Sequence, residues 1–301
     1  MKAHLLVVGG NGFIGRHIAT HALGLDWKVS CLGLSGKSLP GMPGIAADIR
    51  DASALQDALR GRGFDYVVNC GGYIDHANFG NGGRSLIDAH FDGVLNLVQA
   101  IERSTLKRFI NIGSSDEYGS AAAPQSELTR EAPISPYSLG KVAATHFLQM
   151  MHRTEALPAA TLRLFLTYGP GQDQRRFLPQ IIRGCLEDRS FPTSGGEQVR
   201  DFCYIDDTVR AIFLALQNNA VDGEVINIGS GQAVSIRGMI ETVCRMTGGG
   251  KPEFGAVPYR RGENMALYAD VRKAAKLLDW SPRISLEIGL ARTIESYREA
   301  Q

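Results

Sequence analysis

Two side chains near the middle of the chain have the types and the spacing for proton transfer. Tyr137 and Lys141 stand four residues apart in a segment with helical periodicity, so a helix would lay the phenol and the ammonium along one face. A phenol with its ordinary pKa of about 10 is only about 0.1% ionised at neutral pH, and a nearby positive charge favours the ionised form. The pair predicts a tyrosine that exchanges a proton with a bound molecule, although a surface aromatic beside a surface lysine would have the same spacing.

A hydroxyl-rich turn precedes this pair. Ser114 and Ser115 follow the apolar run 109–112 and lie 23 and 22 residues before Tyr137. The run is typical of a buried strand, and ligands gather at the carboxyl ends of the strands in open α/β sheets. We therefore expect the turn to bring its hydroxyl groups to the site of Tyr137 and Lys141.

A third group of residues, at the N-terminus, has the pattern of a dinucleotide site. Gly9, Gly12 and Gly15 follow the first apolar strand and open the first helical segment. Glycines let backbone N–H groups approach a pyrophosphate, and a helix N-terminus adds about half a positive charge. A plain tight turn is the alternative. The residues that we expect to bind a nicotinamide dinucleotide here are Gly9, Gly12, Phe13, Ile14 and Gly15.

The segment after the second expected strand bears on which dinucleotide binds. An NAD site usually offers an acidic residue to the adenosine ribose there, whereas this segment has Gly33, Ser35 and Lys37. Ser35 and Lys37 are suited to a 2′-phosphate, so NADP(H) is favoured, with NAD(H) as the alternative cofactor; Lys37 could also be an ordinary solvated lysine. Asp48 and Ile49 could lie near the adenine amine, but Asp48 could equally be an acid at the start of the next helix.

Composition limits the partners that the protein can have. The 301 residues carry 32 Lys+Arg against 31 Asp+Glu, and a formal charge of +1 provides no long-range field for nucleic acid or an anionic membrane. No stretch approaches the roughly 20 apolar residues of a membrane span, and the N-terminus lacks a signal-peptide pattern. The five cysteines lack a metal or redox spacing, and His17 and His21 have no third ligand in view. We expect a cytoplasmic protein that binds no metal, nucleic acid or membrane.

Short apolar segments alternate with longer helical ones from the N-terminus onward. The expected strands are 5–8, 29–34, 66–70, 109–112 and 162–166, and the expected helices are 13–24, 52–60, 84–102 and 136–155. This order predicts an α/β fold of the Rossmann type, a doubly wound parallel sheet with right-handed crossovers. The alternation breaks after residue 166 and resumes near 203. We expect a dinucleotide-binding domain of residues 1–166 plus 202–228, and a smaller interleaved lobe of residues 167–201 plus 229–301 that binds the substrate.

Taken together, these motifs resemble the extended short-chain dehydrogenase/reductase superfamily, in its NAD-dependent epimerase/dehydratase branch. The resemblance covers nearly the whole chain. The later segments that carry it are Thr161-Leu-Arg-Leu-Phe-Leu-Thr-Tyr-Gly-Pro-Gly171, Arg200-Asp-Phe-Cys-Tyr-Ile-Asp-Asp207, Asn227-Ile-Gly229 and Arg260-Arg-Gly-Glu263.

The resemblance implies a role for each matching residue. Ser114 would hold the reacting oxygen, Tyr137 would exchange its proton, and Lys141 would bind the cofactor ribose and tune the phenol. A nucleotide-diphosphate sugar would be the substrate, and a guanidinium fork suits its diphosphate, although a surface ion pair is the alternative for each arginine. The residues implied to bind this substrate are Arg200, Arg260, Ser115 and Asp116.

Several departures from the family's pattern bear on the reaction. Where its dehydratases have a Thr-Asp-Glu acid/base set, this chain has Ser114, Ser115 and Asp116 followed by Glu117, so the acids are displaced by one position and elimination of water is disfavoured. The Gly-Ser-Ser-Asp-Glu-Tyr-Gly segment looks more like reductases of 4-keto-6-deoxy nucleotide sugars. His90 replaces a usual asparagine and Gly71-Gly72 a usual Ala-Ala, changes that would either widen the pocket or have no effect.

The leading hypothesis is therefore an NADPH-dependent reductase acting at C4 of a nucleotide-linked 4-keto-6-deoxyhexose. An NAD-dependent nucleotide-sugar 4-epimerase is the first alternative, and a 4,6-dehydratase is the second. A nucleotide-sensing protein without turnover is the alternative of a different class, and the intact serine, tyrosine and lysine set argues against it.

The resemblance also implies a homodimer, through the outer faces of the helices expected at 84–102 and 136–155. Apolar residues recur on these helices at helical spacing, although core packing would explain some of them. They are Leu95, Val98, Ala143, Phe147 and Met151.

Overall fold

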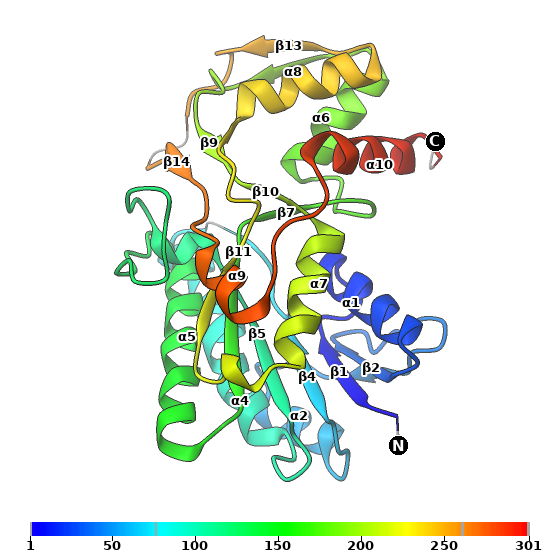
Figure 1. Cartoon of the computed structure of the whole chain (residues 1–301), viewed down its shortest axis with the longest axis vertical. Helices are drawn as coiled ribbons and strands as arrows, with labels where there is room; N and C mark the ends of the chain where they lie inside the picture. The colour runs from blue at the N-terminus through cyan, green and yellow to red at the C-terminus, as the bar shows by residue number, and fades with distance from the viewer. Residues whose placement is uncertain (1, 76, 260–261, 300–301) are drawn as a thin grey trace.

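A seven-stranded parallel sheet lies at the centre of the molecule (Figure 1), in a computed structural model that describes residues 2–75, 77–259 and 262–299. The strands are mostly buried apolar runs, as expected for a parallel sheet with both faces covered. They are β1 (His4–Val8), β2 (Lys28–Gly33), β3 (Gly44–Ala46), β4 (Tyr66–Asn69), β5 (Arg108–Ser114), β6 (Ala159–Leu164) and β11 (Val225–Ile228).

The order of the strands across the sheet is β3, β2, β1, β4, β5, β6, β11. The chain builds outward from β1 to one edge and then returns to continue from β4 to the other edge, so the direction of building reverses between β1 and β4. This arrangement confirms the predicted doubly wound fold. Ligands bind at the carboxyl ends of the strands beside such a reversal.

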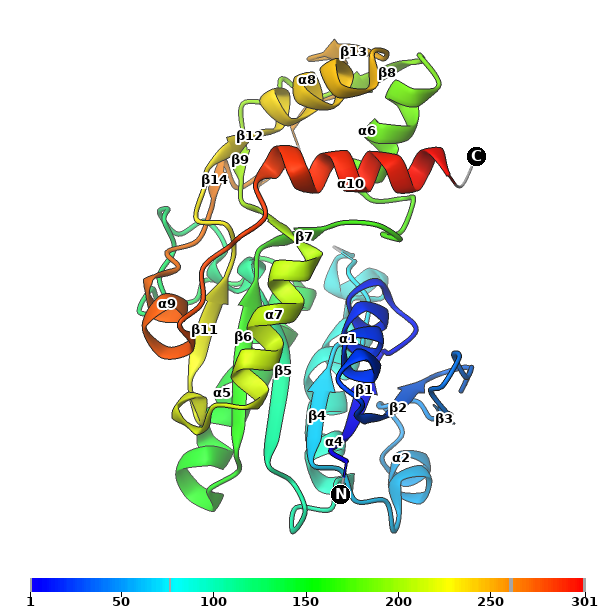
Figure 2. The ribbon, with the colours of Figure 1, turned by 45° about the vertical axis from the view of Figure 1, so that its right-hand side comes forward.

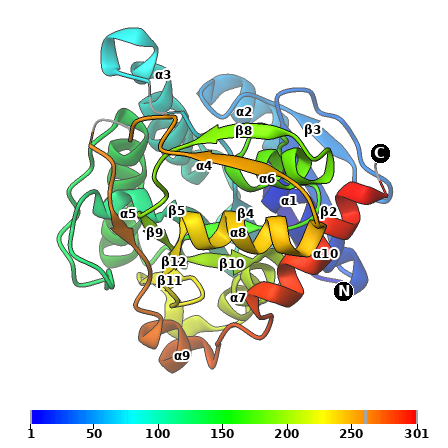
Figure 3. The same cartoon turned by 90° about the horizontal axis from the view of Figure 1, so that it is seen from above.

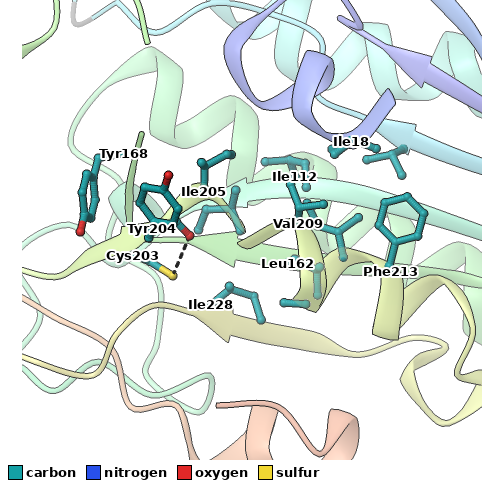
Figure 4. Packing of buried hydrophobic residues seen from close by; sticks show 14 of the residues in the cluster. Ile18, Ile112, Leu162, Tyr168, Cys203, Tyr204, Ile205, Val209, Phe213 and Ile228 are labelled. Carbon is teal, nitrogen blue, oxygen red and sulfur yellow. Dashed lines mark hydrogen bonds between the residues drawn. The ribbon is translucent and has the colours of Figure 1, made fainter. Parts of the chain in front are cut away.

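Helices cover both faces of the sheet (Figure 2). The helices α1 (Phe13–Gly24) and α7 (Ile205–Leu216) pack on one face, where Ile18, Val209 and Phe213 meet the strand residues Ile112 and Leu162 (Figure 4). The helices α2 (Ala52–Leu59), α4 (Gly93–Ala100) and α5 (Pro136–Glu155) cover the other face around a second buried apolar cluster. The two clusters hold the sheet from both sides and so fix the positions of the strand ends.

Helix α5 carries the predicted proton-transfer pair, and its start is specified locally. Ser135 is its N-cap and accepts a hydrogen bond from the backbone N–H of Ser138, while Pro136 occupies the first turn, where its missing N–H costs nothing. Tyr137 therefore lies in the first turn and Lys141 one turn later. Ala156 ends the helix in a left-handed conformation.

The helix expected over 84–102 is present over 83–100 but contains a π-turn, which the prediction of a regular helix missed. The structure has α3 (Gly83–Ile87), a π-helical turn over Asp88–Asp92, and then α4. The turn contains His90, whose ring is buried against Tyr137. A π-turn of this kind commonly occurs at functional sites, because the extra residue redirects one side chain.

Further elements lie beyond the carboxyl ends of the strands (Figure 1), and α6, α8 and α10 cover that end when it is seen from above (Figure 3). The short strands pair as β7 with β10, β8 with β13, and β9 with both β12 and β14. The helices there are α6 (Phe177–Leu186), α8 (Ile236–Thr247) and α10 (Leu286–Arg298), with 3-10 turns at Phe79–Asn81 and Ser115–Tyr118. Helix α9 (Arg272–Leu278) packs instead against β11 and α7, and a 3-10 turn at Asn219–Val221 follows α7. The strands are β7 (Leu166–Tyr168), β8 (Ser190–Thr193), β9 (Val199–Arg200), β10 (Phe202–Tyr204), β12 (Val234–Ser235), β13 (Lys251–Phe254) and β14 (Ala266–Leu267). The division into two domains stays a prediction.

Two contacts join α1 to the loop after β7. The Arg16 guanidinium donates to the carbonyl of Gly171 at 2.7 Å, and His17 Nε2 donates to the carbonyl of Pro170 at 3.0 Å. His17 is thus engaged with the backbone. Along the described part of the chain, every helix is too short or too polar to cross a bilayer.

Candidate active site

The loop between β1 and α1 forms a close-packed backbone cradle. Gly9 has φ of +74°, and a Cβ on Gly15 would lie 2.3 Å from the Gly9 carbonyl oxygen. The N–H of Gly12 donates to that same oxygen at 2.9 Å. Gly12 is the N-cap of α1 and has no side chain to occupy the N–H groups of the first turn, which are left to bind an anion. The residues fit a dinucleotide's pyrophosphate, and Phe13 and Ile14 follow in that first turn.

The loop after β2 lies beside this cradle. The Asn11 side chain donates to the carbonyl of Lys37 at 3.2 Å, and the Ser35 hydroxyl accepts from the N–H of Lys37 at 3.3 Å. Both Ser35 and Lys37 are exposed. The predicted phosphate-binding pair therefore lies next to the glycine loop, while Gly33 at the strand end leaves open space around the position of a Cβ.

Asp48 makes a local ion pair. Its carboxylate accepts from Arg50 at 2.6 Å, and this contact lowers the pKa of Asp48. Asp51, and not Asp48, caps α2 by accepting from the N–H of Ala54, so the alternative of Asp48 as the helix-starting acid is wrong. Ile49 is buried, and its carbonyl accepts from Asn96 at 2.8 Å. The adenine-binding role of these two residues stays a prediction.

Ser114, Tyr137 and Lys141 come together at the carboxyl end of β5. Ser114 is the last residue of the strand, and its side chain shares a hydrogen bond with Tyr137. The Lys141 ammonium donates to the carbonyl of Ile112 at 2.6 Å and lies 5.9 Å from the centre of the Tyr137 ring. Tyr137 and Lys141 are 4% and 6% exposed, so a ligand that reaches them meets groups already removed from bulk water.

Burial dominates the ionisation of the pair. Burial raises the pKa of Tyr137 above its ordinary value, the Asp116 carboxylate raises it further, and the hydrogen bond with Ser114 opposes the rise. Burial also lowers the pKa of Lys141 to about 8, against the opposing effect of the Glu117 carboxylate. Burial and the carboxylates of Asp116 and Glu117 therefore favour the neutral phenol, and the expected effect of Lys141 on the phenol stays a prediction. The Ser114 hydrogen bond and the charge of Arg176 lower the pKa of the phenol and so favour the phenolate.

A buried ion cluster lies directly behind the serine turn. The Glu117 carboxylate accepts from the Ser114 backbone N–H at 2.9 Å, from the Thr145 hydroxyl at 3.0 Å and from Arg163 Nε at 2.8 Å. Arg163 also donates to Glu131. We call these four side chains, Glu117, Glu131, Thr145 and Arg163, the Glu117 cluster. Sequence reasoning did not assign them a role, and the available signal was a charged residue, Arg163, inside an otherwise apolar strand, which requires a buried partner.

His90 packs against the ring of Tyr137. Its ring is perpendicular to that of Tyr137, with centroids 4.8 Å apart, and Nε2 donates to the carbonyl of Tyr73 at 2.8 Å. Burial and the charge of Lys141 lower the pKa of His90 to about 3, so the ring is neutral at ordinary pH. The remaining nitrogen, Nδ1, is buried without a hydrogen-bond partner among the described residues.

The predicted substrate-binding residues are distributed over two regions. Ser115 is buried and Asp116 is partly exposed in the 3-10 turn after β5, beside the catalytic set. Arg200 lies in β9, where its guanidinium pairs with Glu263 and donates to the carbonyl of Val199 at 2.8 Å. Arg260 lies outside the described residues.

The fold and this set of residues define the extended short-chain dehydrogenase/reductase class. A sequence model of the NAD dependent epimerase/dehydratase family matches residues 5–229, and the chain belongs to that family. This confirms the resemblance inferred from the motifs.

Individual relatives are similar over most of the chain. UDP-glucuronate 4-epimerase of Thermodesulfobacterium geofontis is 31% identical over 217 residues, which cover 71% of this chain and 66% of that enzyme. dTDP-glucose 4,6-dehydratase of Xanthomonas campestris pv. campestris is 28% identical over 326 residues, covering 97% and 92%. The structure of UDP-glucuronic acid 4-epimerase from Bacillus cereus, in complex with UDP-glucuronic acid and NAD, is similar with a TM-score of 0.87, at 27% identity over 99% of this chain and all of that one.

Proposed function

We propose that the protein is a nucleotide-sugar 4-epimerase, which oxidises and re-reduces C4 of a sugar held by its nucleotide diphosphate. The relatives described above include two 4-epimerases, which favours this reaction over the reductase hypothesis. The geometry of the serine turn supports this reaction over the dehydratase alternative.

The observation that carries the proposal is the number of carboxylates that the turn offers to a substrate. Elimination of water needs both an acid and a base beside the sugar. Glu117 is fully buried and hydrogen-bonded to Ser114, Thr145 and Arg163. Asp116 is then the one carboxylate of the turn that is partly exposed, which leaves the serine, tyrosine and lysine set for redox chemistry at C4.

In this mechanism Ser114 and Tyr137 act on the C4 oxygen. The Ser114 hydroxyl donates a hydrogen bond to that oxygen, and the Tyr137 phenolate takes the hydroxyl proton as C4 becomes a carbonyl. The protonated phenol returns the proton when C4 is reduced from the other face. Lys141 contributes positive charge and a hydrogen-bond donor beside the phenol.

The glycine loop, the first turn of α1 and Lys141 would hold the dinucleotide. When bound, its nicotinamide supplies the hydride acceptor for the first step and the hydride donor for the second. The deep burial of Tyr137 and Lys141 limits water at the reacting groups, which reduces side reactions of an oxidised sugar with water. Arg200 would bind the diphosphate, with Glu263 orienting its guanidinium.

A panel of UDP- and dTDP-sugars, among them UDP-glucuronic acid and UDP-glucose, tests the proposal. The protein is incubated with each sugar and NAD, products are separated by chromatography, and cofactor absorbance is followed. We expect an isomer of equal mass without net cofactor reduction. A product lighter by one water would instead indicate a dehydratase.

NADP(H)-dependent reduction of a 4-ketosugar is the second candidate. One observation favours it: the strand end at Gly33 and the adjacent Ser35 and Lys37 present no carboxylate to repel a 2′-phosphate. Stoichiometric consumption of NADPH with a nucleotide-linked 4-keto-6-deoxysugar, and no isomerisation of any sugar in the panel, would select this candidate over the epimerase.

A further inference from the structure

The Glu117 carboxylate connects the elements that carry the candidate active site. One oxygen accepts from the backbone N–H of Ser114 at the end of β5. The other accepts from Thr145 on α5 and from Arg163 on β6. Glu117 itself is 0% exposed, so these three contacts are made without competition from water.

The contact with Thr145 ties the serine turn to the helix that bears the other two catalytic groups. Thr145 lies four residues after Lys141 and eight after Tyr137, which places all three on one face of α5. Thr145 donates a hydrogen bond to Glu117, and Glu117 in turn accepts one from the backbone N–H of Ser114. These two bonds fix the separation between the Ser114 and Tyr137 hydroxyls. A misplacement of reacting groups by about 1 Å is enough to cost on the order of a hundredfold in rate.

The negative charge of Glu117 also affects Lys141. The Glu117 cluster and Lys141 together contain two carboxylates, Glu117 and Glu131, and two cations, Arg163 and Lys141. The groups that face Lys141 are Glu117, which favours its charged form, the Cys70 thiol, and the rings of Tyr137 and His90. Glu117 is therefore the buried anion that offsets the desolvation of the Lys141 ammonium.

We propose that Glu117 is a positioning residue of the active site, which holds Ser114 at a fixed distance from Tyr137 and supplies the buried negative charge opposite Lys141. Glu117 acts through its effects on Ser114, Tyr137 and Lys141, and it does not touch the substrate. The inference rests on the proposed function only for the identity of the reacting groups. Glu131 provides a matched control, because it binds the same guanidinium without contacting Ser114 or Thr145.

The experiment compares Glu117→Gln with Glu131→Gln in the full chain. The dissociation constant for NAD is measured from low to high pH, and kcat and KM are measured with the sugar that the wild type isomerises. Removing the anion lowers the pKa of Lys141 below about 8, so NAD binding by Glu117→Gln is expected to weaken at a lower pH than in the wild type. We also expect kcat to fall roughly tenfold or more with little change in KM.

Glu131→Gln should leave the pH midpoint of NAD binding where it is in the wild type. Equal shifts in the two variants, or no shift in Glu117→Gln, would overturn the proposal. The NAD titration needs no sugar, so it still decides the matter if the proposed epimerase activity is absent.

A second pair of variants covers the case in which Glu117→Gln does not fold. Thr145→Val removes the hydrogen bond to Glu117 while keeping the size of the side chain, and Thr145→Ser keeps the hydroxyl. We expect Thr145→Val to lower kcat, or the rate of cofactor turnover with any active substrate, and Thr145→Ser to restore it. Wild-type kcat in a folded Thr145→Val protein would exclude the positioning role.

Discussion

The His90 imidazole occupies the space that a side chain on residue 72 would fill. A Cβ built on Gly72 would lie 2.3 Å from His90 Cε1, and Gly72 has φ of +102°. The two departures from the family's usual residues therefore compensate each other, because the larger ring is accommodated by the missing methyl group. Whether the two changes also widen the pocket stays a prediction.

This fit predicts the consequence of Gly72→Ala. The added methyl group must displace the His90 ring, and the backbone of residue 72 must keep a conformation that alanine disfavours. We therefore expect the free energy of unfolding to fall by about 1 to 3 kcal/mol. Denaturant unfolding measures the loss. Adding His90→Asn should recover part of it, and a Gly72→Ala protein as stable as the wild type would contradict this packing.

Tyr137→Phe is expected to reduce turnover by roughly a hundredfold or more, because the variant lacks the proton that general acid-base catalysis transfers. The ring remains, so its contact with His90 and the binding of the cofactor should be retained. Steady-state kinetics and a cofactor titration measure the two effects. Near-normal turnover would remove Tyr137 from its proposed role.

Lys141→Ala is expected to weaken both cofactor binding and turnover. In the wild type, burial lowers the pKa of Lys141 to about 8, so the ammonium loses its proton as the pH rises through this value. Cofactor binding should therefore weaken above about pH 8 in the wild type, and this dependence should be missing from the variant. An unchanged dissociation constant in Lys141→Ala would argue against its contact with the ribose.

Local signals account for the parts of the structure that the sequence predicted well. The N-cap Ser135 and the following Pro136 mark the start of α5, and the glycine spacing marks the turn before α1. Both signals depend on residues close together in the chain, so they can be recognised without knowledge of the tertiary structure.

The interactions that were not predicted depend on residues far apart in the chain. The ion pair of Glu117 with Arg163 is an example, because the two residues lie 46 positions apart. The bond from Glu117 to the Ser114 backbone had a local signal that was missed, since the two residues have the spacing of a capping box. The π-turn around His90 was missed for a related reason: the apolar pattern on both sides of it is compatible with one continuous helix.

We expect the protein to form a homodimer through the outer faces of α4 and α5, because apolar residues are partly exposed there. Leu95, Ala143 and Phe147 are partly exposed on these helices, whereas Val98 and Met151, expected at the same surface, are buried in the core of the subunit. Met150, on α5, is 39% exposed. We expect a dimeric mass by light scattering at micromolar concentration, and Phe147→Glu should produce monomers because it would place a charge in an apolar contact. A monomeric wild type would refute this prediction.

The end of β2 predicts how cofactor preference responds to one substitution, Gly33→Asp. No atom lies within 4 Å of a Cβ built on Gly33, so the backbone there has open space for the start of a side chain. Its carboxylate would accept hydrogen bonds from the ribose hydroxyls of NAD(H) and repel the 2′-phosphate of NADP(H), for which Ser35 and Lys37 are the predicted ligands. A charge-assisted hydrogen bond is worth about 1.5 to 3 kcal/mol, so the ratio of NADPH to NADH affinity should fall by roughly ten- to a hundredfold at low ionic strength. Fluorescence titrations of the wild type and the variant at two salt concentrations measure that ratio.

Lys37→Ala should also lower the ratio of NADPH to NADH affinity. The effect should be smaller at high salt, because Lys37 is exposed and its charge is screened. An unchanged ratio in both variants would show that the loop after β2 does not contact the ribose. A wild type that binds NADH as tightly as NADPH would remove the phosphate-site interpretation and favour the epimerase over the reductase.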